Sequence, residues 1–307
     1  MEKVIILNPN AGSADATIYQ TAEKLNLPIM LSRYEGHLSK LLLEQSKRGP
    51  TFFLVAGGDG TLNEACNALM KIEKKKRHTH TLAQIPLGTA NDFARSSGWL
   101  APSADHKYVS KILSTPPKTI DLIKIDRNEL PSHYGINVCA GGFVPQMNRT
   151  MNNSLKSILG QASYALGSAR TMIGRQSYEA NLSFDNIAYG ETLNIWNVIV
   201  GKGQYAGGGA KVAPKGCLDD GKLHVYIFRD KGLISSTVDG ALSYWGWHKY
   251  SSRIIYQAVE NFAIHTEPAI PCSSDGELLS GSVKCFSIEA KALQFVCGDQ
   301  AETRLAA

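Results

Sequence analysis

The sequence predicts a chain of two parts, a doubly wound α/β domain over residues 1–125 and a β-sandwich domain over residues 126–291. In the first part, short apolar runs alternate with segments of helical period, the order typical of a parallel sheet covered by helices. After Lys118 the chain changes to short β-type runs separated by turn residues, as in a sandwich. A chain of 307 residues can bury two such cores. We expect the C-terminal tail, residues 292–307, to pack back on the first domain.

The elements of the first part follow from its periodicity. Strands are expected at residues 3–8, 28–32, 51–55 and 81–85, and helices at residues 14–25, 38–45, from 62 onward and at 103–113. Ligands of doubly wound sheets bind outside the carboxyl ends of the strands, so the turns at residues 8–13 and 57–61 are candidate site loops. The basic run from Lys71 to His78 is typical of a solvated helix end, with membrane contact as the alternative.

The second part is expected to be mostly strand. Runs of β-type composition cover residues 119–125, 133–139, 178–184, 193–200, 223–228, 253–259, 261–265 and 283–289. Two helices interrupt them, at residues 155–173 and 233–247. The second helix ends in an aromatic group from Tyr244 to Tyr250. Such a group is typical either of core packing, the commoner use of these rings, or of a membrane interface.

Composition narrows the class of protein without selecting a partner. The net charge of +5 is compatible with an anionic ligand or surface, but it favours neither nucleic acid nor membrane, and no nucleic-acid partner is expected. The six cysteines are scattered without a CxxC pair, so neither a zinc site nor a disulfide framework is indicated. The apolar run at residues 4–7 is too short for a signal peptide, and no run is long enough to span a bilayer. We therefore expect a reduced, cytoplasmic protein.

The stretch at residues 55–64, Val-Ala-Gly-Gly-Asp-Gly-Thr-Leu-Asn-Glu, joins a predicted strand to a predicted helix. Its three glycines let the backbone turn sharply and approach a ligand, and the N–H groups at the helix start favour phosphate. Asp59 is unusual there, because a bare carboxylate repels phosphate. We expect it to act through a cation, a hydroxyl or a backbone N–H group. The alternative is a plain turn in which Asp59 caps the helix.

A second turn of the same kind follows the strand at residues 81–85. It reads Pro-Leu-Gly-Thr-Ala-Asn-Asp-Phe-Ala from Pro86 to Ala94. Thr89 either caps the next helix or holds a phosphate with its hydroxyl and N–H groups. Because the two turns lie in neighbouring βα units, we expect them to converge on one crevice.

Three loops of the second part carry chemistry of their own. The glycines at residues 207–209 allow close approach of the backbone. The stretch at residues 216–223 is one residue short of a P-loop, but Leu223 replaces the required hydroxyl and Asp219-Asp220 would repel phosphate. Paired carboxylates suit Mg²⁺, whereas a solvated Asp-Gly turn is the alternative. The last loop, residues 273–281, reads as an Asp-Gly hairpin in which Glu277 could serve as a base or metal ligand.

Together these motifs resemble the diacylglycerol kinase catalytic-domain family. The two glycine turns, Gly57-Gly58-Asp59-Gly60-Thr61-x-Asn63-Glu64 and Pro86-Leu87-Gly88-Thr89-x-Asn91-Asp92-Phe93-Ala94, carry the resemblance. The rest of the chain is similar to the bacterial lipid-kinase branch in Asn8-Pro9-x-Ala11-Gly12, Ala206-Gly207-Gly208-Gly209, Asp220-Gly221 and Asp275-Gly276-Glu277. The resemblance covers nearly the whole chain in the same order.

The resemblance implies a NAD-kinase/diacylglycerol-kinase-like fold with the active site in the cleft between its two domains. It implies nucleotide contacts from Asn8, Ser32, Gly58, Asp59, Gly60, Thr61, Leu62, Asn63, Glu64 and Thr89. It implies a structural Mg²⁺ held by the Asp220 carboxylate and the carbonyls of Cys217 and Lys222. The proton acceptor is carried over onto Glu277, with Asp275 as its neighbour and Asp59 as the third catalytic residue.

The function expected from this pattern is that of an ATP-dependent lipid kinase. Such an enzyme moves the γ-phosphoryl group of ATP, with Mg²⁺, to a hydroxyl of a membrane lipid, here of diacylglycerol or phosphatidylglycerol type. The expected partners are that lipid and, by transient peripheral contact, the inner face of the membrane, and homodimerisation is compatible with the sequence. The alternatives are a sphingoid or ceramide kinase, a soluble-substrate kinase of NAD-kinase type, and a non-catalytic nucleotide-binding module.

Overall fold

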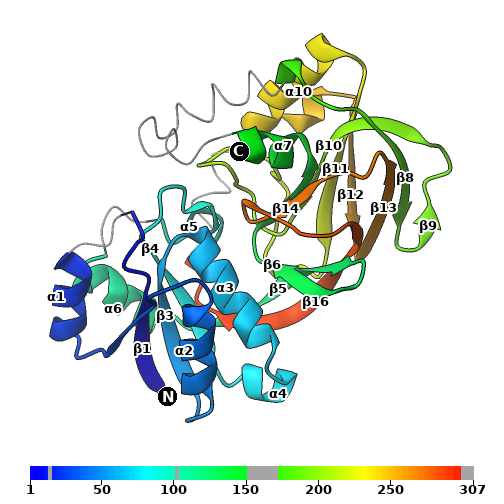
Figure 1. Cartoon of the computed structure of the whole chain (residues 1–307). Helices are drawn as coiled ribbons and strands as arrows, with labels where there is room; N and C mark the ends of the chain where they lie inside the picture. The colour runs from blue at the N-terminus through cyan, green and yellow to red at the C-terminus, as the bar shows by residue number, and fades with distance from the viewer. Residues whose placement is uncertain (13–15, 101–103, 151–171, 299–307) are drawn as a thin grey trace. The chain divides into compact units, whose positions relative to one another are not determined.

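The computed structural model describes residues 1–12, 16–100, 104–150 and 172–298 (Figure 1). The helix expected at residues 155–173 lies almost wholly outside these residues. The chain divides into two compact units. Unit 1 holds Met1–Asp121 and the chain from Ala290 onward, and unit 2 holds Leu122–Glu289. The chain passes between them twice, within β5 (Lys118–Arg127) and within β16 (Val283–Phe295).

The core of unit 1 is a parallel sheet. Its strands are β1 (Glu2–Leu7), β2 (Ile29–Leu31), β3 (Thr51–Gly57) and β4 (Thr81–Pro86), in the order β2-β1-β3-β4. The end of β16 adds a further parallel strand beside β4, where Gln294 and Phe295 pair with Thr81 and Leu82. Every residue of β3 is buried, which explains its nearly continuous apolar sequence.

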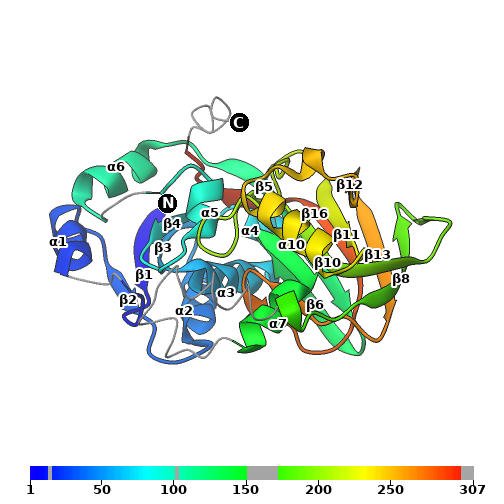
Figure 2. The same cartoon turned by 90° about the horizontal axis from the view of Figure 1, so that it is seen from above.

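Helices cover both faces of this sheet, as Figure 2 shows. One face packs against α1 (Ala16–Lys24) and α6 (His106–Ser114), whose buried Ile18, Val109 and Ile112 join the core of that side. The other face carries α2 (His37–Ser46) and α3 (Asp59–Met70). Two short helices, α4 (Lys74–Arg77) and α5 (Asp92–Ser96), follow α3 and β4. The prediction of a doubly wound α/β domain is confirmed.

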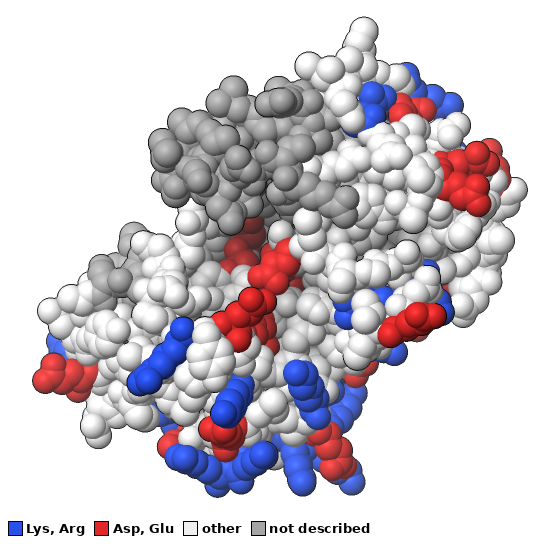
Figure 3. All heavy atoms as spheres, in the orientation of Figure 1, with Lys and Arg blue, Asp and Glu red and all other residues white. Residues whose placement is uncertain are grey.

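The basic run at residues 71–78 differs in part from the expected solvated helix end. Arg77 is only 4% exposed, and its Nε donates to the carbonyl of Ala292 at 2.9 Å. Its Nη1 donates to the carbonyls of Met70 and Ile72. The prediction is therefore wrong for Arg77, which binds the returning tail, although the lysines of α4 are exposed. Figure 3 shows Lys and Arg side chains gathered at the end of unit 1 that carries α4.

Unit 2 is built from antiparallel strands around the central strand β10 (Leu193–Gly201), which pairs with β7, β8 and β11. The other strands of this unit are β6 (Leu130–Gly135), β7 (Val138–Gly142), β8 (Tyr178–Phe184), β9 (Ile187–Ala188), β11 (Leu223–Arg229), β12 (Ile254–Val259), β13 (Asn261–Glu267), β14 (Cys272–Ser274) and β15 (Glu277–Leu278). Alternate side chains of these strands form one apolar core. The prediction of a β-sandwich is confirmed.

Helices α7 (Phe143–Thr150) and α10 (Leu233–Tyr244) and the 3₁₀ turn η1 (His248–Tyr250) complete unit 2. A second apolar cluster joins Phe143 and Met147 of α7 to Trp196 of β10. The core-packing interpretation of the aromatic group at residues 244–250 is wrong for its four aromatic residues, since Tyr244, Trp245, Trp247 and Tyr250 are all more than half exposed, at 51%, 63%, 53% and 68%. Among the described residues, no helix combines the length and apolar character needed to cross a bilayer.

Two predicted strand boundaries are wrong for identifiable reasons. The single strand expected at residues 133–139 is two strands, because the N–H groups of Ile136, Asn137 and Val138 turn away to the Asp275 carboxylate. The strand expected at residues 283–289 continues to Phe295, because its last residues pair with β4 in unit 1.

Candidate nucleotide site and catalytic loops

Three loops of unit 1 follow the carboxyl ends of β1, β3 and β4. The first two are joined by Asn8, whose Nδ2 donates to the Thr61 hydroxyl at 3.1 Å. The Oδ1 atom of Asn8 accepts from the N–H group of Asn10 at 3.0 Å, which fixes the side chain in its own loop. Asn8 therefore holds the hydroxyl at the start of α3 in a defined position.

The loops after β3 and β4 meet backbone to backbone at Gly58 and Gly88. A Cβ atom placed on Gly88 would lie only 2.5 Å from the Gly58 Cα atom, closer than real Cβ contacts allow. The Cβ position of Gly12, in the first loop, lies 3.5 Å from the Thr89 hydroxyl. The expected convergence of the two glycine turns is thus present, and the loop after β1 joins them.

Asp59 makes the strongest link between these loops. Its Oδ2 accepts from the N–H group of Asp92 and its Oδ1 from that of Phe93, both at 3.0 Å. Burial raises the pKa of Asp59, while these backbone N–H groups act to lower it. The carboxylate therefore caps α5 rather than its own helix α3, whose cap residue Gly58 provides no side chain. Of the three roles expected for Asp59, the structure shows the bond to backbone N–H groups.

Asn91 is a residue of this site that the sequence reasoning missed. Its Oδ1 accepts from the Gly88 N–H group at 2.9 Å, and its Nδ2 donates to the Gly88 carbonyl at 2.7 Å. Asn91 stands at the cap position of α5 with φ of 50°, a conformation that asparagine tolerates better than most residues. Because Asn91 occupies the cap position of α5, the alternative in which Thr89 caps this helix is wrong. Thr89 itself is exposed in the loop after β4.

The remaining residues of the implied nucleotide set divide into two groups. Leu62 and Asn63 are buried, and Glu64 accepts from the Ser39 N–H group at 2.9 Å, which ties α3 to the start of α2. Ser32 is also buried, and its N–H group donates to the Leu7 carbonyl at the end of β1. The residues of the set that are partly or fully accessible are Asn8, Gly58, Asp59, Gly60, Thr61, Glu64 and Thr89. These last residues have the access that a ligand needs.

In unit 2, the expected Asp-Gly hairpin is present between β14 and β15. Asp275 and Gly276 form its turn with φ of 50° and 90°. The Asp275 carboxylate accepts from three backbone N–H groups, those of Ile136 and Asn137 at 2.9 Å and that of Val138 at 3.0 Å. Glu277, the first residue of β15, is exposed. The two carboxylates of this loop therefore differ: that of Asp275 binds backbone N–H groups, and Glu277 is an exposed residue.

The residues of the implied structural Mg²⁺ site do not fit a metal ion. The Oδ1 atom of Asp220 accepts from the Lys202 ammonium at 2.8 Å, and its Oδ2 lies 2.9 Å from Nε2 of His224. The Lys222 carbonyl accepts from the same ammonium at 2.9 Å. Within the described part of the chain, no three His, Cys, Asp or Glu side chains are grouped to hold a metal. The sequence reasoning missed Lys202 and His224, because neither belongs to a motif.

Glycine and hydroxyl loops at the carboxyl ends of parallel strands, followed by a β-sandwich unit, are the arrangement that the resemblance to lipid kinases implied, and the comparisons with known proteins agree with it. The diacylglycerol kinase catalytic domain family matches residues 2–125, and the YegS C-terminal NAD kinase beta sandwich-like domain matches residues 137–297. The chain belongs to the diacylglycerol kinase catalytic-domain family, in the bacterial branch of YegS-like lipid kinases.

Individual relatives agree with this assignment. The chain is 29% identical over 283 residues to the probable lipid kinase YegS of Shigella flexneri, covering 91% of this chain and 90% of that protein. It is 30% identical to the probable lipid kinase YegS-like protein of Chromohalobacter salexigens, covering 82% and 78%. A solved structure of a diacylglycerol kinase from Bacillus anthracis strain Sterne superposes with a TM-score of 0.75 over 97% of each chain. That structure is 24% identical, so it supports the fold alone.

Proposed function

We propose that this kinase transfers the γ-phosphoryl group of ATP to a hydroxyl of a membrane lipid of diacylglycerol or phosphatidylglycerol type. The observation that carries the proposal is the junction of three loops at the carboxyl ends of β1, β3 and β4, held by Asn8, Asp59 and the Gly58–Gly88 contact. A phosphate-binding site in a doubly wound sheet is expected at this edge.

The phosphates of the nucleotide are bound in this proposal by the start of α3. The helix has no side-chain cap, so its first N–H groups are available to an anion, and the hydroxyls of Thr61 and Thr89 lie in adjoining loops. Asp59 acts as a positioning residue, because both its oxygens hold α5. Mg²⁺ accompanies ATP as the counter-ion of its phosphates and neutralises their charge during transfer.

The proton of the lipid hydroxyl is accepted in this proposal by Glu277. Its exposure on β15 leaves the carboxylate accessible to a substrate. Asp275 is a poorer candidate for the base, because three N–H groups already bind its carboxylate. We assign Asp275 the role of positioning the hairpin that presents Glu277.

The proposal is tested by incubating the protein with γ-labelled ATP, Mg²⁺ and a total bacterial lipid extract. Parallel reactions contain diacylglycerol, phosphatidylglycerol, sphingosine, ceramide or NAD alone. Label is expected in a lipid product that diacylglycerol or phosphatidylglycerol reproduces. Label in NAD alone would overturn the lipid assignment, and tight ATP binding without any product would favour the non-catalytic alternative.

We further propose that the protein meets the bilayer through an α10 surface. This surface consists of Leu233, Ile234, Val238, Tyr244, Trp245, Trp247 and Tyr250 with the flanking Lys231 and Lys249. Ile234 is 83% exposed, and the one acidic residue between positions 231 and 250, Asp239, is buried in a pair with Arg253. Exposed tryptophan and tyrosine beside lysine are typical of groups that lie at the headgroup level of a membrane.

A further inference from the structure

Lys202 follows directly after β10, and its side chain is fully buried. Its ammonium group donates to the Asp220 Oδ1 atom at 2.8 Å and to the Lys222 carbonyl at 2.9 Å. A buried ammonium is costly unless it is paired and hydrogen-bonded, and both requirements are met here. The side chain thus joins the end of β10 to the loop that leads into β11.

The two oxygens that bind Lys202 are also two of the three implied metal ligands. A cation that bridged them would have to displace the ammonium or stand beside it. Mg²⁺ needs about six oxygens at about 2.1 Å in octahedral geometry, and it keeps its water reluctantly. Like charges at such close range repel each other strongly, and the Lys202 side chain is fully buried and cannot move out into solvent without unpacking. One cation, the ammonium or the metal, therefore fits between these oxygens.

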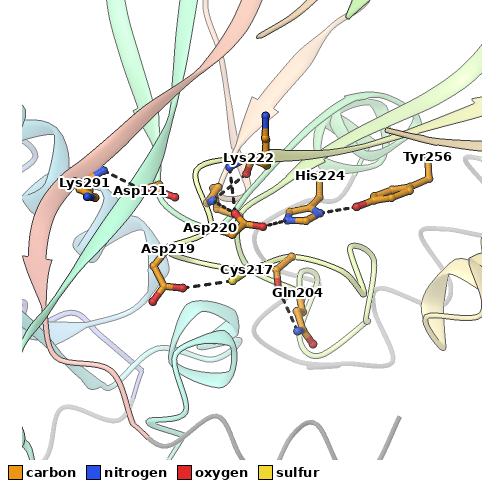
Figure 4. A network of polar contacts seen from close by, with 11 residues as sticks. Asp121, Gln204, Cys217, Asp219, Asp220, Lys222, His224, Tyr256 and Lys291 are labelled. Carbon is orange, nitrogen blue, oxygen red and sulfur yellow. Dashed lines mark hydrogen bonds and ion pairs between the residues drawn. The ribbon is translucent and has the colours of Figure 1, made fainter. Parts of the chain in front are cut away.

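The Asp220 carboxylate already has two partners in the protein. Its Oδ1 atom binds the Lys202 ammonium, and its Oδ2 atom binds the His224 imidazole. Figure 4 shows His224 between Asp220 and Tyr256, within 2.9 Å of each. The Lys202 ammonium thus compensates the charge of Asp220, which is the one carboxylate among the three implied metal ligands.

We infer that the Lys202 ammonium is the structural cation of this chain: it stands where a metal ion would bridge the Asp220 carboxylate and the Lys222 carbonyl. The loop before β11 is therefore held by a covalently attached charge and does not depend on Mg²⁺. The inference concerns the stability of unit 2 and is independent of the proposed substrate and of the metal that accompanies ATP.

The inference is tested by thermal unfolding of the full chain without nucleotide, in EDTA and in MgCl₂. The melting temperature of the natural protein is expected to be the same in both. Lys202→Asn removes the ammonium and leaves the oxygens, so we expect a drop on the order of 10 °C in EDTA. Added MgCl₂ is expected to recover part of that drop, because the vacated oxygens then suit a hard cation.

Lys222→Met is the matched control. It removes an ammonium from the same loop, but one that is 40% exposed and pairs with Glu260 at the surface, so little change is expected. A natural protein that loses stability in EDTA and regains it in MgCl₂ would overturn the inference. So would a Lys202→Asn variant as stable as the natural protein, or one that MgCl₂ does not stabilise. If Lys202→Asn does not fold, the natural protein in EDTA still decides the question.

Discussion

At the scale of single residues, Asp59 shows how a carboxylate in a ligand-binding motif can act by holding backbone in place instead of by contacting a ligand. Its carboxylate accepts hydrogen bonds from two N–H groups of α5, a helix that begins 33 residues later in the chain. We predict that Asp59→Asn lowers the free energy of unfolding by about 1–3 kcal/mol, because the amide cannot accept both bonds. We also expect turnover to fall on the order of a hundredfold, since the loops lose their alignment.

Urea unfolding and the labelled-ATP assay measure the two effects of Asp59→Asn. Glu73→Gln is the control, because it changes an exposed carboxylate of the same unit to an amide at a position that makes no side-chain cap. An Asp59→Asn protein that keeps full stability would contradict the positioning role.

Removing the charge of either carboxylate in the β14–β15 hairpin should affect a different property, turnover for Glu277 and stability for Asp275. Glu277→Gln is expected to reduce turnover by about a hundredfold or more with little change in melting temperature, because the exposed side chain keeps its size and loses its basicity. Asp275→Asn is expected to lower the melting temperature, because three N–H groups lose a charged acceptor. Full activity of Glu277→Gln would rule out Glu277 as the proton acceptor.

The sequence identified which residues are special but not what they bind. The glycine turns were recognisable because glycine, carboxylate and hydroxyl follow a strand at fixed spacing. The partners of Asp59 were not recognisable, because Asp92 and Phe93 contribute backbone atoms that carry no sequence signal. Lys202 was missed for another reason: a single lysine after an apolar run reads as the solvated end of a strand, and its burial appears only in the packed structure.

At the scale of elements, the sequence did not decide whether the aromatic group from Tyr244 to Tyr250 packs in the core or lies at a membrane, and the structure leaves these rings exposed. We predict that Ile234→Asp and Trp245→Asp each reduce the fraction of protein bound to anionic lipid vesicles by about tenfold, from lost apolar burial and added negative charge. Vesicle flotation in the absence of ATP provides the measurement.

Ile187→Asp is the matched control for the α10 surface, because Ile187 is 73% exposed in the same unit but lies on β9. Its vesicle binding should equal that of the natural protein. Equal losses from all three variants would point to a general effect of negative charge and remove α10 from the proposal.

At the scale of the whole molecule, buried histidines couple stability to pH. Burial lowers the pKa of His248 to about 4, against 6.5 for the free side chain. A depressed pKa favours folding above pH 6.5, and this contribution is lost as the pH falls toward 4. For His248, which is 7% exposed, the contribution is about 3 kcal/mol when complete.

We therefore predict that the free energy of unfolding falls between pH 7 and pH 4 and that His248→Gln makes this fall shallower. Urea unfolding at several pH values in that window measures it. His265→Gln replaces an exposed histidine of the same unit and should keep the slope of the natural protein. An identical slope in His248→Gln would show that His248 does not titrate as its burial requires.

The fold as a whole was more predictable than its boundaries. Periodicity distinguished the α/β part from the sandwich because each helix and strand exposes one face and buries another. It did not predict where β16 ends, because its last residues depend on β4, more than 200 positions earlier in the chain.

The position of β16 has a practical consequence for anyone who wishes to dissect this protein. A fragment that stops near residue 121 contains the three candidate nucleotide loops, yet it lacks Gln294 and Phe295, which pair with β4. In such a fragment β4 would be an exposed edge strand. Its unpaired N–H and C=O groups could pair with another molecule and cause aggregation. Separate expression of unit 1 thus requires that the described residues from Ala290 to Gly298 be joined back onto it.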